Sequence, residues 1–118
     1  GSRVGVQLPA AVDRARDQHV DVAHRRALVA RSIALLLAAA RRLSEGEQYI
    51  REGNWRTWHP TTLLGHDVTG ATLGIVGLGR IGAAVAKRAA AFDMRVIPYG
   101  PRLTDEKAQA AGVERVSL

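Results

Sequence analysis

The residues whose types and spacing suggest chemistry are three glycines in a Gly-x-Gly-x-x-Gly pattern, Gly77, Gly79 and Gly82. Gly77 would permit a sharp turn, Gly79 would let a phosphate approach the backbone, and Gly82 would let a helix pack closely on a strand. The first turn of that helix would present N–H groups and a partial positive charge to the phosphates. The pattern therefore predicts a pyrophosphate site for a dinucleotide, made of Gly77, Leu78, Gly79, Arg80, Ile81 and Gly82.

The residues on both sides of this turn fit the same interpretation. Residues 72–76 form a short apolar run, typical of a parallel strand that is covered on both faces. Apolar residues then recur near helical spacing from Ile81 to Phe92, and residues 94–99 form a second strand-like run. Glycines also mark ordinary turns, but the order strand, turn, helix favours a dinucleotide site.

The end of the second strand indicates which dinucleotide would bind. Sites that prefer NAD place a carboxylate about 20 residues after the glycine turn, where this sequence has Gly100. Arg102 follows and could bind a 2′-phosphate or stack on adenine, although it could also be a solvated turn residue. We therefore predict NADP in preference to NAD. The predicted cofactor site is completed by Tyr99, Gly100, Pro101 and Arg102.

No other set of residues predicts catalysis or metal binding. The sequence has no cysteine, and its four histidines, His19, His24, His59 and His66, lack the spacing of metal ligands. A catalytic base needs a partner within hydrogen-bond reach, and this sequence offers none for His59 or His66. We therefore predict neither a catalytic nor a metal-binding residue.

The composition bounds the class of protein. The 118 residues are 47% hydrophobic and 24% charged, which is typical of one globular domain. The net charge of +6 comes from arginines concentrated in residues 1–44, where few aromatic residues lie between them. This pattern favours a solvated helix face over a nucleic-acid surface. No apolar run approaches the ~20 residues of a membrane span and no secretory signal is recognisable, so we expect a cytoplasmic protein without a membrane partner.

Two helices are expected before the glycine turn. Residues 22–43 are rich in alanine, leucine and arginine, and are apolar on nearly all sides from residue 33 to 40, which predicts a long helix with most of its surface buried. A second helix is predicted over residues 44–51, with Ser44 as its N-cap and Glu47 completing a capping box. Residues 10–20 favour a loop or weak helix, and residues 4–8 a short strand.

The remaining segments predict association. Residues 55–65 form an irregular arm with both tryptophans, which should pack on a partner chain or, alternatively, on their own domain. After the second strand, Thr104 should cap a helix to about Ala111, and residues 113–118 alternate like a third strand. A three-stranded half-sheet leaves an unpaired edge, and together with the arm this predicts a homodimer.

Residues 28–118 resemble the D-isomer-specific 2-hydroxyacid dehydrogenases, near the glyoxylate/hydroxypyruvate reductase branch. The resemblance is carried by residues 33–43, 51–55, 58–60, 64–70 and, above all, 72–82. Phosphoglycerate, formate and phosphite dehydrogenases are the alternative relatives. The resemblance implies an α/β fold, with about three strands of a Rossmann-type parallel sheet preceded by the long helix.

The same resemblance implies a two-domain oxidoreductase that transfers hydride between NAD(P)H and a 2-oxo acid such as glyoxylate or hydroxypyruvate. The catalytic arginine, acidic residue and histidine of that family lie beyond the third strand. We therefore expect this chain alone to be inactive, either as the cofactor-binding portion of such an enzyme or as a nucleotide-binding or dimerisation module. Residues 1–27 are expected to be a divergent segment, and residues 28–118 a partial cofactor domain with an interdomain or dimerisation helix and arm.

Overall fold

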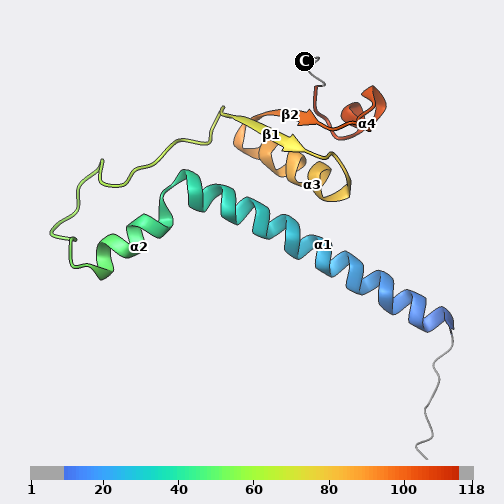
Figure 1. Cartoon of the computed structure of the whole chain (residues 1–118), viewed down its shortest axis with the longest axis horizontal. Coiled ribbons are helices and arrows are strands. Elements are labelled where there is room, and N and C mark those ends of the chain that lie inside the picture. Colours follow the sequence, from blue (N-terminus) through green and yellow to red (C-terminus); the bar gives the residue numbers. More distant parts are fainter. Residues whose placement is uncertain (1–9, 115–118) are drawn as a thin grey trace, which may run out of the picture.

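The computed structural model describes residues 10–114 and shows an extended chain of 66 × 50 × 22 Å (Figure 1). Its helices and strands are α1 (Ala10–Ala40), α2 (Leu43–Arg51), β1 (Thr72–Val76), α3 (Arg80–Ala89), the 3-10 helix η1 (Ala90–Phe92), β2 (Arg95–Tyr99) and α4 (Asp105–Ala110). The strand expected at residues 4–8 lies outside the described residues. No helix in the described part of the chain is both long and apolar enough to cross a membrane.

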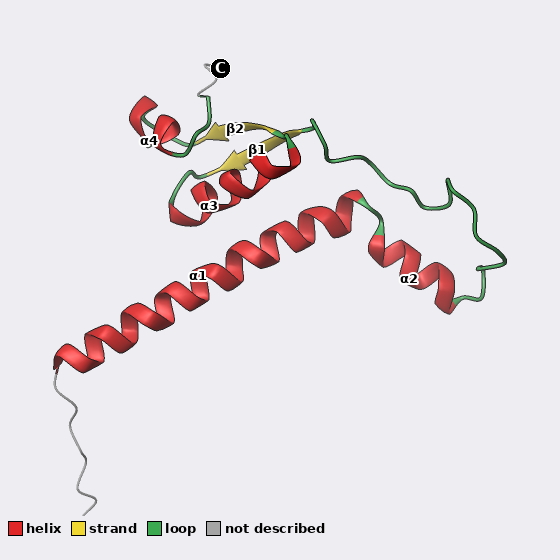
Figure 2. Ribbon diagram, turned by 180° about the vertical axis from the view of Figure 1, so that it is seen from behind, coloured by secondary structure: helices red, strands yellow, loops and turns green. Residues whose placement is uncertain are grey.

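The two strands and α3 form a parallel β-α-β unit, as predicted. β1 and β2 pair in register from Thr72 opposite Arg95 to Val76 opposite Tyr99. Figure 2 shows α3 between this sheet and α1, and both the sheet and α1 contact α3. This arrangement places the turn from β1 to α3 at the same end of the sheet as the end of β2.

The core lies between α3 and one face of the sheet. Ala86 and Ala89 of α3 and Val96 of β2 are buried, and Leu73 and Ile75 pack against them. Small alanines on the inner face of α3 let the helix approach the sheet closely.

The prediction that β1 is covered on both faces is wrong for the described chain. Its residues alternate between exposed and half-buried, and the side chain of Val76 is 85% exposed. The physical reason is that α3 packs on the face that carries Leu73 and Ile75, whereas the opposite face is open.

Helix α1 differs from its prediction in length and in burial. It is continuous from Ala10, so residues 10–20 follow the helical alternative of their prediction and not the loop, and it ends at Ala40 rather than at residue 43. Val29 is buried, but Leu35 is 64% exposed, so the expectation of a helix buried on most of its surface is also wrong. α3 contacts one side of α1, and Figure 1 shows the N-terminal part of α1 extending beyond α3.

Helix α2 begins after a sharp bend rather than at a capping box. Arg42 has a left-handed backbone (φ 55°) and precedes Leu43, and no side chain caps the helix, so the prediction of Ser44 as N-cap is wrong. Arg42 instead donates from Nε to Glu45 Oε2 at 2.9 Å. This hydrogen bond lowers the pKa of the Glu45 carboxyl and raises that of Arg42. Glu47 accepts from Arg51 at 2.7 Å, and Gly53 follows the helix with φ +73°.

The arm of residues 55–65 is irregular, as predicted, and returns to the end of α1. The N–H of His66 donates to the carbonyl of Ala40 at 2.7 Å. A Cβ on Gly65, which has φ +73°, would overlap that carbonyl and lie 2.8 Å from Arg41 Cα. The side chains of Trp55 and Trp58 are 50% and 73% exposed, so the described chain itself does not bury them.

The segments that flank the sheet are held by short-range hydrogen bonds. Before β1, the carboxylate of Asp67 accepts from the N–H of Thr69 at 2.9 Å, which lowers the pKa of Asp67. After β2, the hydroxyl of Thr104 accepts from the N–H of Lys107 at 3.3 Å and caps α4, as predicted. Gly112 follows α4 with φ +68°. Of the third strand expected at residues 113–118, Val113 and Glu114 are irregular and the rest lies outside the described residues.

Candidate cofactor site

The glycine turn connects β1 to α3 in a conformation that requires glycine. Gly77 has φ +89°, a region that side-chain-bearing residues rarely adopt. Its N–H donates to the carbonyl of Tyr99 at 2.8 Å and fixes the turn against the end of β2. Gly79 is the N-cap of α3 and has an extended backbone, without a side-chain cap. Within the described chain, the first N–H groups of α3 are therefore left for a bound acceptor.

The other two glycines differ in what surrounds them. A Cβ added at Gly79 would meet open space, so the backbone there can be approached by a ligand. A Cβ added at Gly82 would overlap the carbonyl oxygen of Gly77 and lie 3.3 Å from Ile75 Cγ2. Gly82 therefore allows the close contact between α3 and the turn that the sequence pattern predicts.

A cavity of about 290 Å³ lies between the glycine turn and the loop that follows β2. It is lined by Gly77, Leu78, Gly79, Gly100, Pro101, Arg102, Leu103 and Lys107. The volume is at the lower end of the ~300–1,000 Å³ that is usual for pockets of drug-sized ligands, so it suits one nucleoside half of a dinucleotide.

The structure brings together most, but not all, of the predicted cofactor residues. Arg80, Ile81 and Gly82 lie in the first turn of α3 beside the cavity rather than in its lining. Ile81 and Gly82 line a separate apolar cavity of about 440 Å³ between α1, β1 and α3. Tyr99 contributes its carbonyl to the turn, whereas its side chain is 56% exposed.

Sequence reasoning did not identify Leu103 and Lys107 as parts of this site. Lys107 lies three residues after the cap residue Thr104, and its Nζ donates to the carbonyl of Arg102 at 3.4 Å. The correctly predicted cap was the available signal, because the first turn of α4 carries position 107 back toward the loop after β2.

The lining of the cavity is positively charged. It contains Arg102 and Lys107 and no carboxylate. A Cβ at Gly100 would lie 3.9 Å from the backbone of Gly77, which is ordinary contact, and the φ of Gly100 is not positive. Backbone geometry therefore does not require a glycine at position 100, and a carboxylate there would fit.

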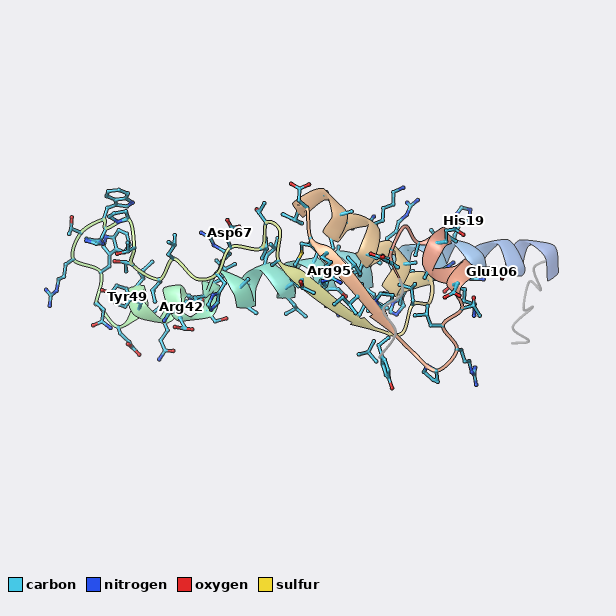
Figure 3. The ribbon with its side chains drawn as sticks, turned by 90° about the horizontal axis from the view of Figure 1, so that it is seen from above. His19, Arg42, Tyr49, Asp67, Arg95 and Glu106 are labelled. Carbon is cyan, nitrogen blue, oxygen red and sulfur yellow. The ribbon has the colours of Figure 1, made fainter. Side chains whose placement is uncertain are left out.

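The described part of the chain holds no group of three metal-ligating side chains. The irregular arm of residues 55–65 is far from the cavity: Figure 1 shows it beside α2, and Figure 3 shows Tyr49 of α2 and Arg42, which precedes α2, at the opposite end from Glu106 of α4. His59 and His66 belong to that distant region and do not line the cavity.

A parallel β-α-β unit with a glycine turn at its first crossover, and a cavity at the carboxyl ends of its strands, defines a Rossmann-type dinucleotide-binding domain. Residues 33–118 match the model of the D-isomer specific 2-hydroxyacid dehydrogenase family, NAD binding domain. The chain belongs to this family, which confirms the resemblance and the fold class predicted from the sequence.

Individual relatives agree with this assignment. The chain is 53% identical over 88 residues to a glyoxylate reductase of Korarchaeum cryptofilum, covering 74% of this chain and 26% of that protein. The solved TT0316 protein of Thermus thermophilus is 48% identical, with a TM-score of 0.63, over 77% of this chain and 28% of that one. A D-lactate dehydrogenase of Aquifex aeolicus, solved with NAD and lactic acid, is 26% identical with a TM-score of 0.64, over 79% and 27%. The chain thus spans about a quarter of the length of these relatives.

Proposed function

We propose that this chain is the cofactor-binding portion of an oxidoreductase that transfers hydride between NAD(P)H and a 2-oxo acid such as glyoxylate or hydroxypyruvate. The observation that carries the proposal is the glycine turn, in which Gly77 has the positive φ, Gly79 is open to a ligand and Gly82 contacts the turn closely. The glyoxylate reductase of Korarchaeum cryptofilum supports this class of substrate.

Each part of the site has a physical role in this proposal. The free N–H groups at the start of α3 would bind the pyrophosphate, since a helix N-terminus favours an anion. Leu78, Pro101 and Leu103 give the cavity apolar walls for the adenosine half. The bound cofactor would supply or accept the hydride, and the described residues orient its adenine-bearing half.

We propose further that NADP binds in preference to NAD. Gly100 removes the carboxylate that would repel a 2′-phosphate, although the backbone would tolerate a side chain there. Arg102 lines the cavity and offers a planar guanidinium to the phosphate.

Titration of the protein with NADPH and NADH tests this preference. We expect tighter binding of NADPH in the native chain and a reversed preference in Gly100→Asp. Equal or tighter binding of NADH by the native chain would contradict the preference for NADP but not the dinucleotide site itself.

Binding without turnover is the expected behaviour of these 118 residues on their own. No histidine lines the cavity, and the arm that carries His59 and His66 lies elsewhere in the described chain. A rate assay with glyoxylate and NADPH, at concentrations that saturate the cofactor site, should give no turnover above background. A measurable rate that Gly82→Ala abolishes would show that the chain contains its own catalytic groups.

We also propose that two copies of the chain associate through the arm. Trp55, Trp58 and Leu64 are at least half exposed, and exposed aromatic residues of this size are unusual outside interfaces. Light scattering over a range of concentrations should give a dimer that Trp58→Ala weakens. A monomer of 12.7 kDa at all concentrations would contradict the homodimer.

A further inference from the structure

We propose that Lys107 is a second specificity-determining residue of the cofactor site, which holds the 2′-phosphate of NADP together with Arg102. The inference rests on the proposed dinucleotide site and adds a group that the glycine pattern and the end of β2 do not indicate.

Two hydrogen bonds place Lys107 beside the loop after β2. Its N–H donates to the hydroxyl of Thr104 at 3.3 Å, and its Nζ donates to the carbonyl of Arg102 at 3.4 Å. The ammonium therefore lies next to Arg102 at the wall of the cavity. An ammonium has three donors, so Nζ retains two for a ligand.

The charge of the cavity favours a phosphate over a neutral group. Arg102 and Lys107 both line it, and no carboxylate does. Asp105 and Glu106 precede Lys107 by two and one residues, and side chains at these spacings do not share a helix face.

Three basic side chains elsewhere in the described chain form ion pairs. Arg25 and Arg51 each pair with a carboxylate four residues away on their own helix, and Arg42 pairs with Glu45 three residues away. The two cations that line the cavity would each attract a bound phosphate, which carries about two negative charges.

The side chains of Arg102 and Lys107 can contact different parts of the bound NADP. The planar guanidinium of Arg102 can stack on adenine or bind a phosphate in a bidentate manner. The ammonium of Lys107 is a compact charge, which suits a phosphate at the edge of the adenosine cavity. The 2′-phosphate is the one group that distinguishes NADP from NAD. Lys107 should therefore strengthen the binding of NADPH and leave the binding of NADH unchanged.

The test compares Lys107→Gln with Lys87→Gln in the full chain, titrated with NADPH and with NADH. Lys87 is the other lysine of the sequence, lies exposed on α3 and does not line the cavity, so its replacement removes the same charge. Glutamine is one atom shorter than lysine but stays polar and uncharged, and the backbone N–H of residue 107 can still donate to Thr104.

We expect Lys107→Gln to weaken NADPH binding by roughly tenfold or more, as for the loss of a hydrogen bond to a charged group, and to change NADH binding by less than about twofold. Lys87→Gln should change neither, and Lys107→Arg should restore most of the affinity for NADPH. The effect of Lys107→Gln should shrink at high salt, because salt screens an exposed charge.

Three outcomes would overturn the proposal. Unchanged NADPH binding in Lys107→Gln would exclude a contact with the phosphate. Equal weakening of NADPH and NADH would show that Lys107 only supports the loop. If the native chain bound neither dinucleotide, the proposed function would fail first, and this inference with it.

Discussion

Replacing Gly82 by alanine tests the packing that shapes the glycine turn. The added methyl group would overlap the carbonyl of Gly77 and lie 3.3 Å from Ile75 Cγ2. This carbonyl is part of the backbone, and the N–H of Gly77 already donates to the carbonyl of Tyr99. The turn therefore has to shift as a unit to make room for the methyl group. Overpacking of this kind costs about 1–3 kcal/mol. Alanine regains up to about 1 kcal/mol of helix propensity, so we expect a net loss of about 1–2 kcal/mol.

Gly46→Ala is the matched control for this experiment. Gly46 lies within α2, has open space around its Cβ position and does not have a positive φ. The same substitution there should raise stability by about 0.5–1 kcal/mol, because alanine is the better helix former.

Urea unfolding measures both variants, and a titration with NADPH measures the turn directly. Gly82→Ala should lower both the free energy of unfolding and the affinity for the dinucleotide, whereas Gly46→Ala should leave the affinity unchanged. If Gly82→Ala proved as stable as Gly46→Ala and bound the dinucleotide normally, the packing argument would be refuted.

Three further substitutions test other parts of the chain. Gly65→Ala should destabilise by about 1–3 kcal/mol in urea unfolding, because the methyl group overlaps the carbonyl of Ala40 at a positive φ; unchanged stability would contradict this packing. Thr104→Ala should lower the free energy of unfolding by about 1 kcal/mol, because α4 loses its cap, and it should also weaken NADPH binding. An unaltered affinity for NADPH would show that the cap does not influence the cofactor site. The lowered pKa of Asp67 means that its ionised form stabilises the fold at neutral pH, and that this contribution disappears as the pH falls through the lowered pKa. Asp67→Asn should remove this part of the pH dependence in acid titrations, and an unchanged profile would contradict the role of its hydrogen bond to Thr69.

The β-α-β unit could be predicted because its signals are local. The apolar run of β1, the glycines of the turn and the periodic residues of α3 lie within about twenty consecutive residues, and each favours the same structure. The cap at Thr104 was predictable for the same reason, since it depends on a neighbouring backbone group.

The errors concern the burial of α1 and the start of α2. The apolar surface of α1 was recognised, but its sequence does not show what covers it, and Leu35 is exposed in the described chain. For residues 10–20 the sequence left a loop and a weak helix open, and they are helical, because a helix that extends beyond its neighbours needs helix propensity rather than an apolar face. The start of α2 was misplaced because Arg42 adopts a left-handed conformation and bonds Glu45.

The cavity itself could be predicted only in part. Its glycine side follows from a known spacing, whereas Leu103 and Lys107 enter it because the turn bonds the end of β2 and α4 folds back toward it. The glycine spacing carries no information about where Leu103 and Lys107 lie relative to the turn.

Backbone amide shifts in a ¹⁵N NMR titration with NADPH test the central claim most directly. We predict saturable shifts that are largest at residues 77–82, Gly100, Arg102 and Leu103, with little change in α2 and in the arm of residues 55–65. Saturable shifts confined to α2 or the arm, or no saturable shift at all, would contradict the assignment of the glycine turn as the dinucleotide site.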